Sequence, residues 1–173
     1  MTGVTIRAAQ PSDVEGLPRM QVAAGVLFRD LGMDLVADGP PPDTAGFDEA
    51  QRAGRLLVAT ANESGIVVGF VLTRPLDGAL HVDQVTVAQG WGGQGIGRSL
   101  MQAAEKLAVR EGFARMSLTT FRDVPFNGPF YAGLGWKPLE DAQLTPGLAT
   151  ERKQETAAGL DRWPRCAMVK SVG

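Results

Sequence analysis

The sequence predicts an α/β fold of the α+β kind, in which about four helices flank a mixed, mostly antiparallel sheet of about seven strands. Two observations carry this prediction. Three strand-like stretches follow one another within residues 55–87 and are separated by short turns, which favours an antiparallel meander. A helix that starts at Ile96 then connects the strand at 80–88 to a strand at 113–121. Because a helical crossover joins them, these two strands should run parallel.

The first third of the chain is expected to begin with a strand at residues 4–9. Apolar spacing over the next stretch predicts one helix that ends near Gly32. Residues 33–54 are rich in proline and acid, and we expect a loop there with a short helix from Phe47 to Arg52.

Local patterns also place the later elements. The meander should turn at residues 62–65 and 75–78, and the helix after Ile96 should stop at Gly112. Beyond the strand at 113–121 we expect a short helix closed by Gly135, a strand at 136–140 and a last strand at 165–172.

Length and composition suit one domain over residues 1–173. The chain is 44% hydrophobic and 21% charged, which is ordinary for a globular protein. The formal net charge of −2 gives no reason to expect nucleic acid, whose binding needs clustered Lys and Arg. Cys166 is the one cysteine, which excludes an intrachain disulfide and a thiolate metal cage, and we expect no metal.

The sequence gives no sign of a membrane-bound protein. It lacks the charged and apolar segments of a signal peptide at its start, and no run of about 18 apolar residues occurs. We therefore expect a cytoplasmic protein.

The stretch "GWGGQGIGRSL", residues 90–100, contains five glycines and leads into the helix. A strand, a glycine loop and a helix N-terminus in this order form an anion site, because unpaired N–H groups converge there and the helix dipole adds positive charge. A tight turn without ligand needs only one or two glycines, and each additional one loses backbone entropy on folding. The loop is therefore expected to bind a phosphate.

Two nucleotide motifs match this loop but not its surroundings. Residues 90–95 fit the dinucleotide pattern G-x-G-x-x-G, and residues 92–99 fit a Walker A loop with Arg98 in place of lysine. A dinucleotide fold needs further alternating strands and helices, whereas a hairpin meander precedes this loop. A Walker A loop also needs the lysine that reaches the β and γ phosphates, and this sequence lacks it.

The run "HVDQVTVAQGWGGQGIGRSLM", followed by "FYAGLGW", closely resembles the GNAT superfamily of acetyl-CoA-dependent N-acetyltransferases. "TFRDVPFNGPFY" and "GLDRWPRCAMV" extend the resemblance to about residues 4–172. It implies a single GNAT-type domain whose parallel strands splay apart to admit the cosubstrate. The family's loop begins with Gln or Arg where this chain has Gly92, so one side chain of the motif is missing.

The resemblance implies a set of residues for coenzyme A. Backbone groups of the strand before the loop would pair with the pantetheine arm, amides of the loop would bind the pyrophosphate, and a later Asn would contact the arm. These residues are Val85, Thr86, Val87, Gly92, Gly93, Gln94, Gly95, Ile96, Gly97, Arg98, Ser99, Asn127 and Tyr131. A plain cap or turn role for Asn127 before Pro129 fits the sequence equally well.

Tyr131, the one tyrosine, occupies the family's position for the acid that protonates the departing thiolate. Its reference pKa of ~10 keeps it protonated at neutral pH, and transfer to a thiolate is uphill by only ~2 kcal/mol. Its alternative role is aromatic packing.

Two residues on one face of the same strand, His81 and Asp83, are the candidates for the general base. His81 lies where the histone-acetylating branch of the superfamily has its catalytic glutamate, although a lone strand histidine is more often structural. Asp83 is the second candidate.

The expected reaction is direct attack of a primary amine on acetyl-CoA, and the alternative is a non-catalytic acyl-CoA-binding module. The acceptor would be a small molecule, an amino acid or a peptide, with no nucleic acid or membrane partner; a homodimer is compatible with the resemblance. Residues 29–54 carry six acids against two arginines, which either attract a cationic acceptor or form a solvated acidic loop.

Overall fold

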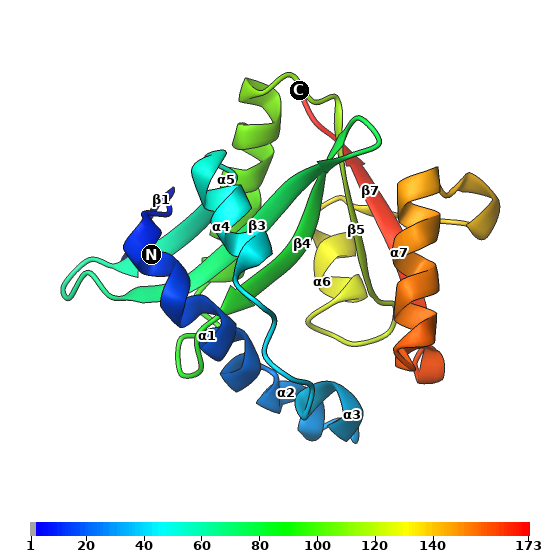
Figure 1. Ribbon diagram of the computed structural model, residues 1–173, viewed down its shortest axis with the longest axis horizontal. Helices are drawn as coiled ribbons and strands as arrows, with labels where there is room; N and C mark the ends of the chain where they lie inside the picture. The colour runs from blue at the N-terminus through cyan, green and yellow to red at the C-terminus, as the bar shows by residue number, and fades with distance from the viewer. Residues whose placement is uncertain (1–2) are drawn as a thin grey trace. The chain divides into compact units, whose positions relative to one another are not determined.

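A computed structural model describes residues 3–173 (Figure 1). Seven strands form one sheet in the order β1-β2-β3-β4-β5-β7-β6. Their bounds are β1 Val4–Ala8, β2 Leu56–Ala61, β3 Val67–Leu76, β4 Ala79–Val87, β5 Arg115–Phe121, β6 Lys137–Leu139 and β7 Arg165–Ser171. The helices are α1 Leu17–Ala24, α2 Val26–Arg29, α3 Asp34–Ala37, α4 Ala45–Arg52, α5 Ile96–Arg110, α6 Gly128–Gly133 and α7 Pro146–Ala157, with short 3-10 helices at Pro11–Gly16, Asp141–Gln143 and Leu160–Arg162.

The pairing of the strands confirms the predicted mixed, mostly antiparallel sheet. β1 pairs antiparallel with β2, β2 with β3, and β7 with both β5 and β6. β4 and β5 are the parallel pair, joined at Leu80↔Met116 and His81↔Ser117. The splaying of this pair stays a prediction.

The chain divides into two compact units, and the boundary crosses β4. The first unit holds the residues up to Thr73 together with Gln84–Lys106, and the second holds Arg74–Asp83 together with Leu107–Gly173. A single domain over residues 1–173 also stays a prediction.

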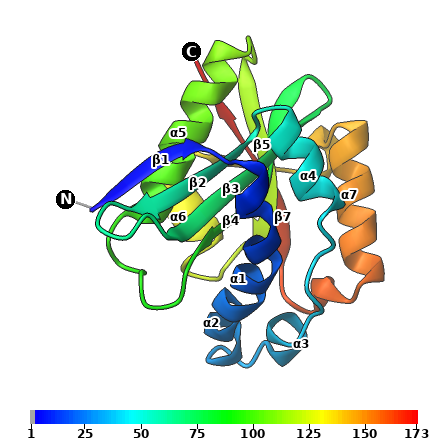
Figure 2. The same ribbon diagram turned by 60° about the vertical axis from the view of Figure 1, so that its left-hand side comes forward.

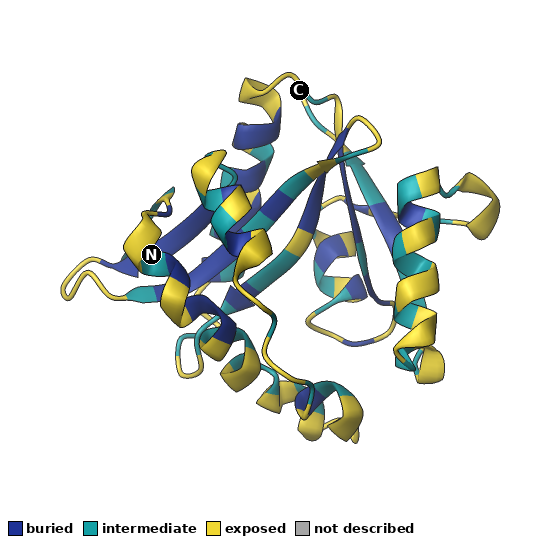
Figure 3. Cartoon of the chain, viewed as in Figure 1, coloured by how far each residue is buried: buried dark blue, intermediate teal, exposed yellow. Residues whose placement is uncertain are grey.

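In the first unit, β1, β2 and β3 lie side by side in two views (Figures 1 and 2). All six residues of β2 are buried (Figure 3). A core of apolar side chains joins β2 and β3 to α4, to α1 and to the 3-10 helix before α1, and Phe47 meets Phe70 edge to face with ring centroids 5.4 Å apart. This core holds β3 in place.

The prediction of one continuous helix ending near Gly32 was wrong, because the segment is divided into separate helices. The structure has a 3-10 helix, then α1, then α2. Pro18 is tolerated because it lies in the first turn of α1, where its missing N–H is not needed. At Gly25 a Cβ atom would lie 3.1 Å from the Val22 carbonyl oxygen, so a side chain would crowd the end of α1 where the helix breaks.

Most other predicted elements are confirmed, and two helices are additional. The short helix at 47–52 is α4, which starts two residues earlier, and α3 was not predicted. The predicted turn at 75–78 is tighter, because β3 continues through Pro75 and Asp77 and Gly78 alone form the turn with φ of 52° and 78°.

α7 is the larger omission, since no helix was predicted between residues 140 and 164. Its start is nevertheless marked by Thr145, whose Oγ1 accepts the Leu148 N–H at 3.5 Å, and by Pro146 at the first helical position. With α3 and α7, the helices outnumber the four expected. Within residues 3–173 no helix combines the length and apolar character needed to cross a membrane.

Candidate active site

The glycine loop lies in the first unit, between β4 and α5. Gly90, Gly93 and Gly95 adopt positive φ of 89°, 75° and 79°, a conformation that favours glycine. Residues 92–95 are exposed. The Ser99 N–H bonds to the Gly95 carbonyl at 3.0 Å, which starts the helical ladder, and the N–H groups before it have no helical partner. The loop therefore offers a row of open backbone donors at a helix N-terminus.

Packing beneath the loop fixes the start of α5. Ile96 and Leu100 are fully buried, at 1% and 0% exposure. They approach β3 at Gly69, where a Cβ atom would lie 3.2 Å from Leu100 Cδ1 and 2.9 Å from the Thr86 carbonyl oxygen. A side chain at position 69 would push the helix away, so this glycine helps to place the loop.

The strand residues expected to meet pantetheine alternate in exposure. Thr86 is buried, and its hydroxyl accepts from Gln84 Nε2 at 3.0 Å, while Val85 and Val87 are half-buried. Thr86 thus points into the protein. Of the first helical turn, Gly97 and Ser99 are half-buried and Arg98 is exposed.

Gly92, where the family's motif has Gln or Arg, is not constrained by the fold. It lacks a positive φ, and a Cβ atom built on it meets nothing within 4 Å. The missing side chain of the motif is therefore a feature of this sequence that the backbone does not require.

The two candidate bases lie in the second unit, in different environments. His81 is 2% exposed, with Nδ1 2.9 Å from Ser117 Oγ and Nε2 3.7 Å from Asp83 Oδ1. Burial, assisted by the positive charge of Arg74, lowers the His81 pKa to about 4. The ring is thus neutral and enclosed, as in a structural histidine.

Asp83 is more accessible, with 27% of its side chain exposed. Both of its carboxylate oxygens accept from Arg74 Nε, at 3.0 and 2.9 Å. Burial raises the pKa of Asp83, and Arg74 opposes that rise. Of the two candidates, Asp83 presents the more open group.

Sequence reasoning missed the residues that surround Asp83. Arg74 also donates through Nη2 to Glu151 of α7, and the next turn of α7 carries Glu155. Glu155 accepts from Arg165 Nε at 3.0 Å, from Arg152 Nη1 at 2.8 Å and from the Thr119 hydroxyl. The Glu-x-x-x-Glu spacing after Thr145 and Pro146 was the available signal.

Tyr131 is buried in α6, where its ring meets Phe130 and Trp136 edge to face at 5.2 and 6.1 Å. Burial raises the pKa of its hydroxyl, which keeps the hydroxyl protonated and makes it a weaker acid than a free tyrosine. Asn127 precedes the helix, where its carbonyl accepts the Tyr131 N–H at 3.0 Å and its side chain makes no capping bond. The structure therefore does not use the Asn127 amide as a cap.

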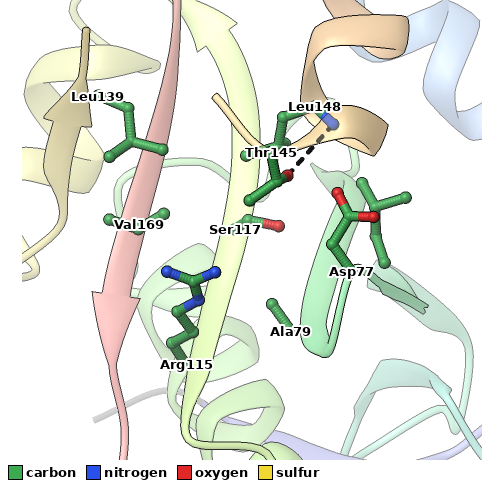
Figure 4. A pocket seen from close by; sticks show the side chains of 9 residues that line it. Asp77, Ala79, Arg115, Ser117, Leu139, Thr145, Leu148 and Val169 are labelled. Atoms are coloured by element: carbon green, nitrogen blue, oxygen red, sulfur yellow. Dashed lines mark hydrogen bonds between the residues drawn. The ribbon is translucent and has the colours of Figure 1, made fainter. Parts of the chain in front are cut away.

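A small pocket also lies in the second unit, bordered by Asp77, Arg115, Ser117 and Thr145 (Figure 4). It has room for about one water molecule. It cannot hold coenzyme A. Among residues 3–173 no group of three His, Cys, Asp or Glu side chains is arranged to hold a metal ion.

The six acids of residues 29–54 belong to the first unit, and all but the half-buried Asp48 are exposed. Arg29 donates to Asp38 and lies 3.9 Å from Asp34, so one arginine offsets part of the negative charge. Asp43 is engaged locally, accepting the Ala45 N–H at 3.0 Å.

Comparison with known proteins identifies the family. The model of the acetyltransferase (GNAT) family matches residues 27–136, more than half of the chain. This chain belongs to that family, and membership of a family of acetyltransferases favours an enzyme over the non-catalytic alternative. The predicted acetyl donor, acetyl-CoA, is the cosubstrate expected for a member of this family.

Individual proteins resemble this chain either over part of its sequence or in its fold. N-alpha-acetyltransferase 80 of Mus musculus is 40% identical over 101 residues, which are 56% of this chain and 30% of that protein. The PaiA N-acetyltransferase of Thermoplasma acidophilum, solved in complex with coenzyme A, superposes with a TM-score of 0.71 at 16% identity, covering 97% of this chain and 98% of that one. The ribosomal-protein-S18-alanine N-acetyltransferase of Escherichia coli gives 0.67 at 15%, covering 98% and 94%.

Proposed function

We propose that this protein transfers the acetyl group of acetyl-CoA to a primary amine by direct attack. The acceptor is a small molecule, an amino acid or a peptide. The observation that carries the proposal is the row of open N–H groups at residues 92–97, which lead into a helix whose start is fixed by Ile96 and Leu100. Such donors fit a pyrophosphate, since glycine leaves room for the phosphate oxygens beside the backbone.

The remaining proposed binding contacts come from the first turn of α5, from β4 and from Asn127 before α6. Arg98 and Ser99 lie in the first turn of α5, within reach of an anion held by the loop amides. The backbone of Val85 and Val87 is available to pair with the pantetheine arm, and the uncapped Asn127 amide supplies a further contact.

Each catalytic residue moves one proton. Acetyl-CoA supplies the acetyl group as a thioester. Asp83 accepts the proton that the amine loses as its nitrogen bonds to the acetyl carbon, directly or through a water molecule. Tyr131 gives its hydroxyl proton to the sulfur as the carbon–sulfur bond breaks. The two residues return to their starting states by proton exchange with solvent.

Asp83 replaces His81 as the preferred base for geometric reasons. The imidazole is enclosed, and Ser117 occupies one of its nitrogens. The imidazole therefore has no open face through which it could accept the proton of the amine.

A turnover assay against a library of primary amines tests the proposal, with release of the free thiol of coenzyme A as readout. We expect amine-dependent thiol release that the Asp83→Asn variant loses in large part. Binding of ATP or NAD in place of acetyl-CoA, measured by calorimetry, would contradict the proposed ligand of the glycine loop. Cytoplasmic location and a homodimer remain parts of the proposal that cell fractionation and light scattering check.

A further inference from the structure

Arg74 is shared between two carboxylates that come from different elements of the second unit. Its Nε bonds to both oxygens of Asp83 on β4, at 3.0 and 2.9 Å, and its Nη2 donates to Glu151 on α7. Arg74 itself lies near the end of β3. One guanidinium thus joins three elements, and Glu151 is the partner that the sequence did not reveal.

This cluster is half-buried and carries one negative charge in excess. The side chains of Arg74, Asp83 and Glu151 are 39%, 27% and 25% exposed. His81, 3.7 Å from Asp83, is neutral and does not offset the excess. The next carboxylate on α7, Glu155, is engaged by Arg152 and Arg165. Two carboxylates therefore compete for the positive charge of Arg74.

We propose that Glu151 is a positioning residue for acetyl transfer, which holds the Arg74 guanidinium between two carboxylates and so keeps Asp83 basic enough to accept the proton of the amine. This inference rests on the proposed function, in which Asp83 is the base. Glu151 acts through Arg74 and does not touch the reacting atoms.

The physical reason lies in how the charge of Arg74 is divided. With Glu151 present, Nη2 is committed to α7, and the negative charge of Glu151 itself disfavours a second charge on Asp83. Without Glu151, the guanidinium of Arg74 has Asp83 as its one carboxylate partner in the cluster. Its whole positive charge and its N–H groups then stabilise the Asp83 anion. A carboxylate that is better stabilised as an anion is a weaker base.

The experiment compares the pH dependence of kcat/KM for wild type and Glu151→Gln, with the best amine from the library assay. We expect the acidic limb of the Glu151→Gln profile to move to lower pH by roughly half a unit to one unit, and the plateau to fall severalfold. Glu151→Asp, which keeps the charge, restores much of the wild-type profile. Glu63→Gln removes the same charge from an exposed turn outside the cluster and leaves the profile unchanged.

The position of the limb separates this role from a purely structural one, because it does not depend on the fraction of folded enzyme. A Glu151→Gln limb at the wild-type pH overturns the inference, even if the plateau falls. The proposed base is tested separately: if Asp83→Asn keeps wild-type activity at every pH, Asp83 is not the base and the proposed function fails in that part. An altered Asp83→Asn profile with an unaltered Glu151→Gln profile overturns only the role of Glu151.

Discussion

The imidazole of His81 and the hydroxyl of Ser117 lie 2.9 Å apart, at one of the two positions where β4 and β5 pair in parallel. Both side chains are 2% exposed. In Ser117→Ala the buried Nδ1 loses this partner, and an unsatisfied buried group is destabilising by about 1–3 kcal/mol. We expect a lower midpoint in urea unfolding, whereas Ser171→Ala, at an exposed strand end, changes little. Equal midpoints for the two variants would contradict the importance of this bond.

The free energy of unfolding should decrease as the pH is lowered, because His81 becomes protonated. Its pKa is about 4 in the folded protein and near 6.5 when unfolded, so the unfolded chain binds the proton more tightly. The neutral ring stabilises the fold fully above pH 6.5, and this contribution, roughly 3 kcal/mol, is lost as pH falls towards 4. Urea unfolding between pH 7 and 4 measures it. His81→Asn should show a clearly shallower slope; the same slope in both proteins would exclude His81 as the source.

Two glycines of the loop should respond in opposite directions. Gly95→Ala places a side chain at φ 79° and strains the loop, so acetyl-CoA binding should weaken. Gly92→Arg adds a cation where a Cβ atom meets nothing, and a charge-assisted bond to phosphate should tighten binding by roughly tenfold. Calorimetry with coenzyme A measures both, with Gly92→Ala as the neutral control. The loop is not the pyrophosphate site if neither variant shifts the affinity.

Removal of the Tyr131 hydroxyl should affect turnover without affecting binding. Tyr131→Phe keeps the ring contacts with Phe130 and Trp136, so the fold should persist. General acids contribute a factor of about 10²–10⁴, and we expect kcat to fall by about a hundredfold or more with an unchanged Kd for acetyl-CoA. Wild-type kcat in the Phe variant would assign Tyr131 to packing alone.

Glu155 should matter for stability more than any exposed charge of α7. Although burial alone would raise its pKa, bonds from Arg165, Thr119 and Arg152 hold that pKa below the usual range. Glu155→Gln leaves Arg165, 9% exposed, without its carboxylate and should destabilise the protein by about 2 kcal/mol. Lys153→Gln on the exposed face of the same helix should stay within about 0.5 kcal/mol of wild type. Matching losses in both variants would show that Glu155 has no special role.

The elements predicted well are those whose signal is local. The strands of the meander alternate or are continuously apolar, and the face of α5 repeats through Ile96 and Leu100, so periodicity alone places them. The glycine loop was also recognisable, because its proposed chemistry resides in its own backbone.

The parts that were missed depend on partners distant in sequence. α7 buries Leu148 and is otherwise polar, so it has no apolar stripe; its ion pair to Arg74 spans 77 residues. Local sequence patterns do not indicate such contacts. The choice of Asp83 over His81 likewise depends on how far each side chain is buried, which the structure shows and the sequence does not.

The start of α7 is built onto the turn between β3 and β4. The Gly147 N–H donates to Asp77 Oδ2 at 2.7 Å, and a Cβ atom at position 147 would lie 2.5 Å from Leu76 Cδ1. The two sites are 70 residues apart, yet they are coupled: a larger residue at 147 requires the side chains of Leu76 and Asp77 to move, or a smaller residue at 76. Among relatives that keep this helix, positions 76, 77 and 147 should therefore vary together.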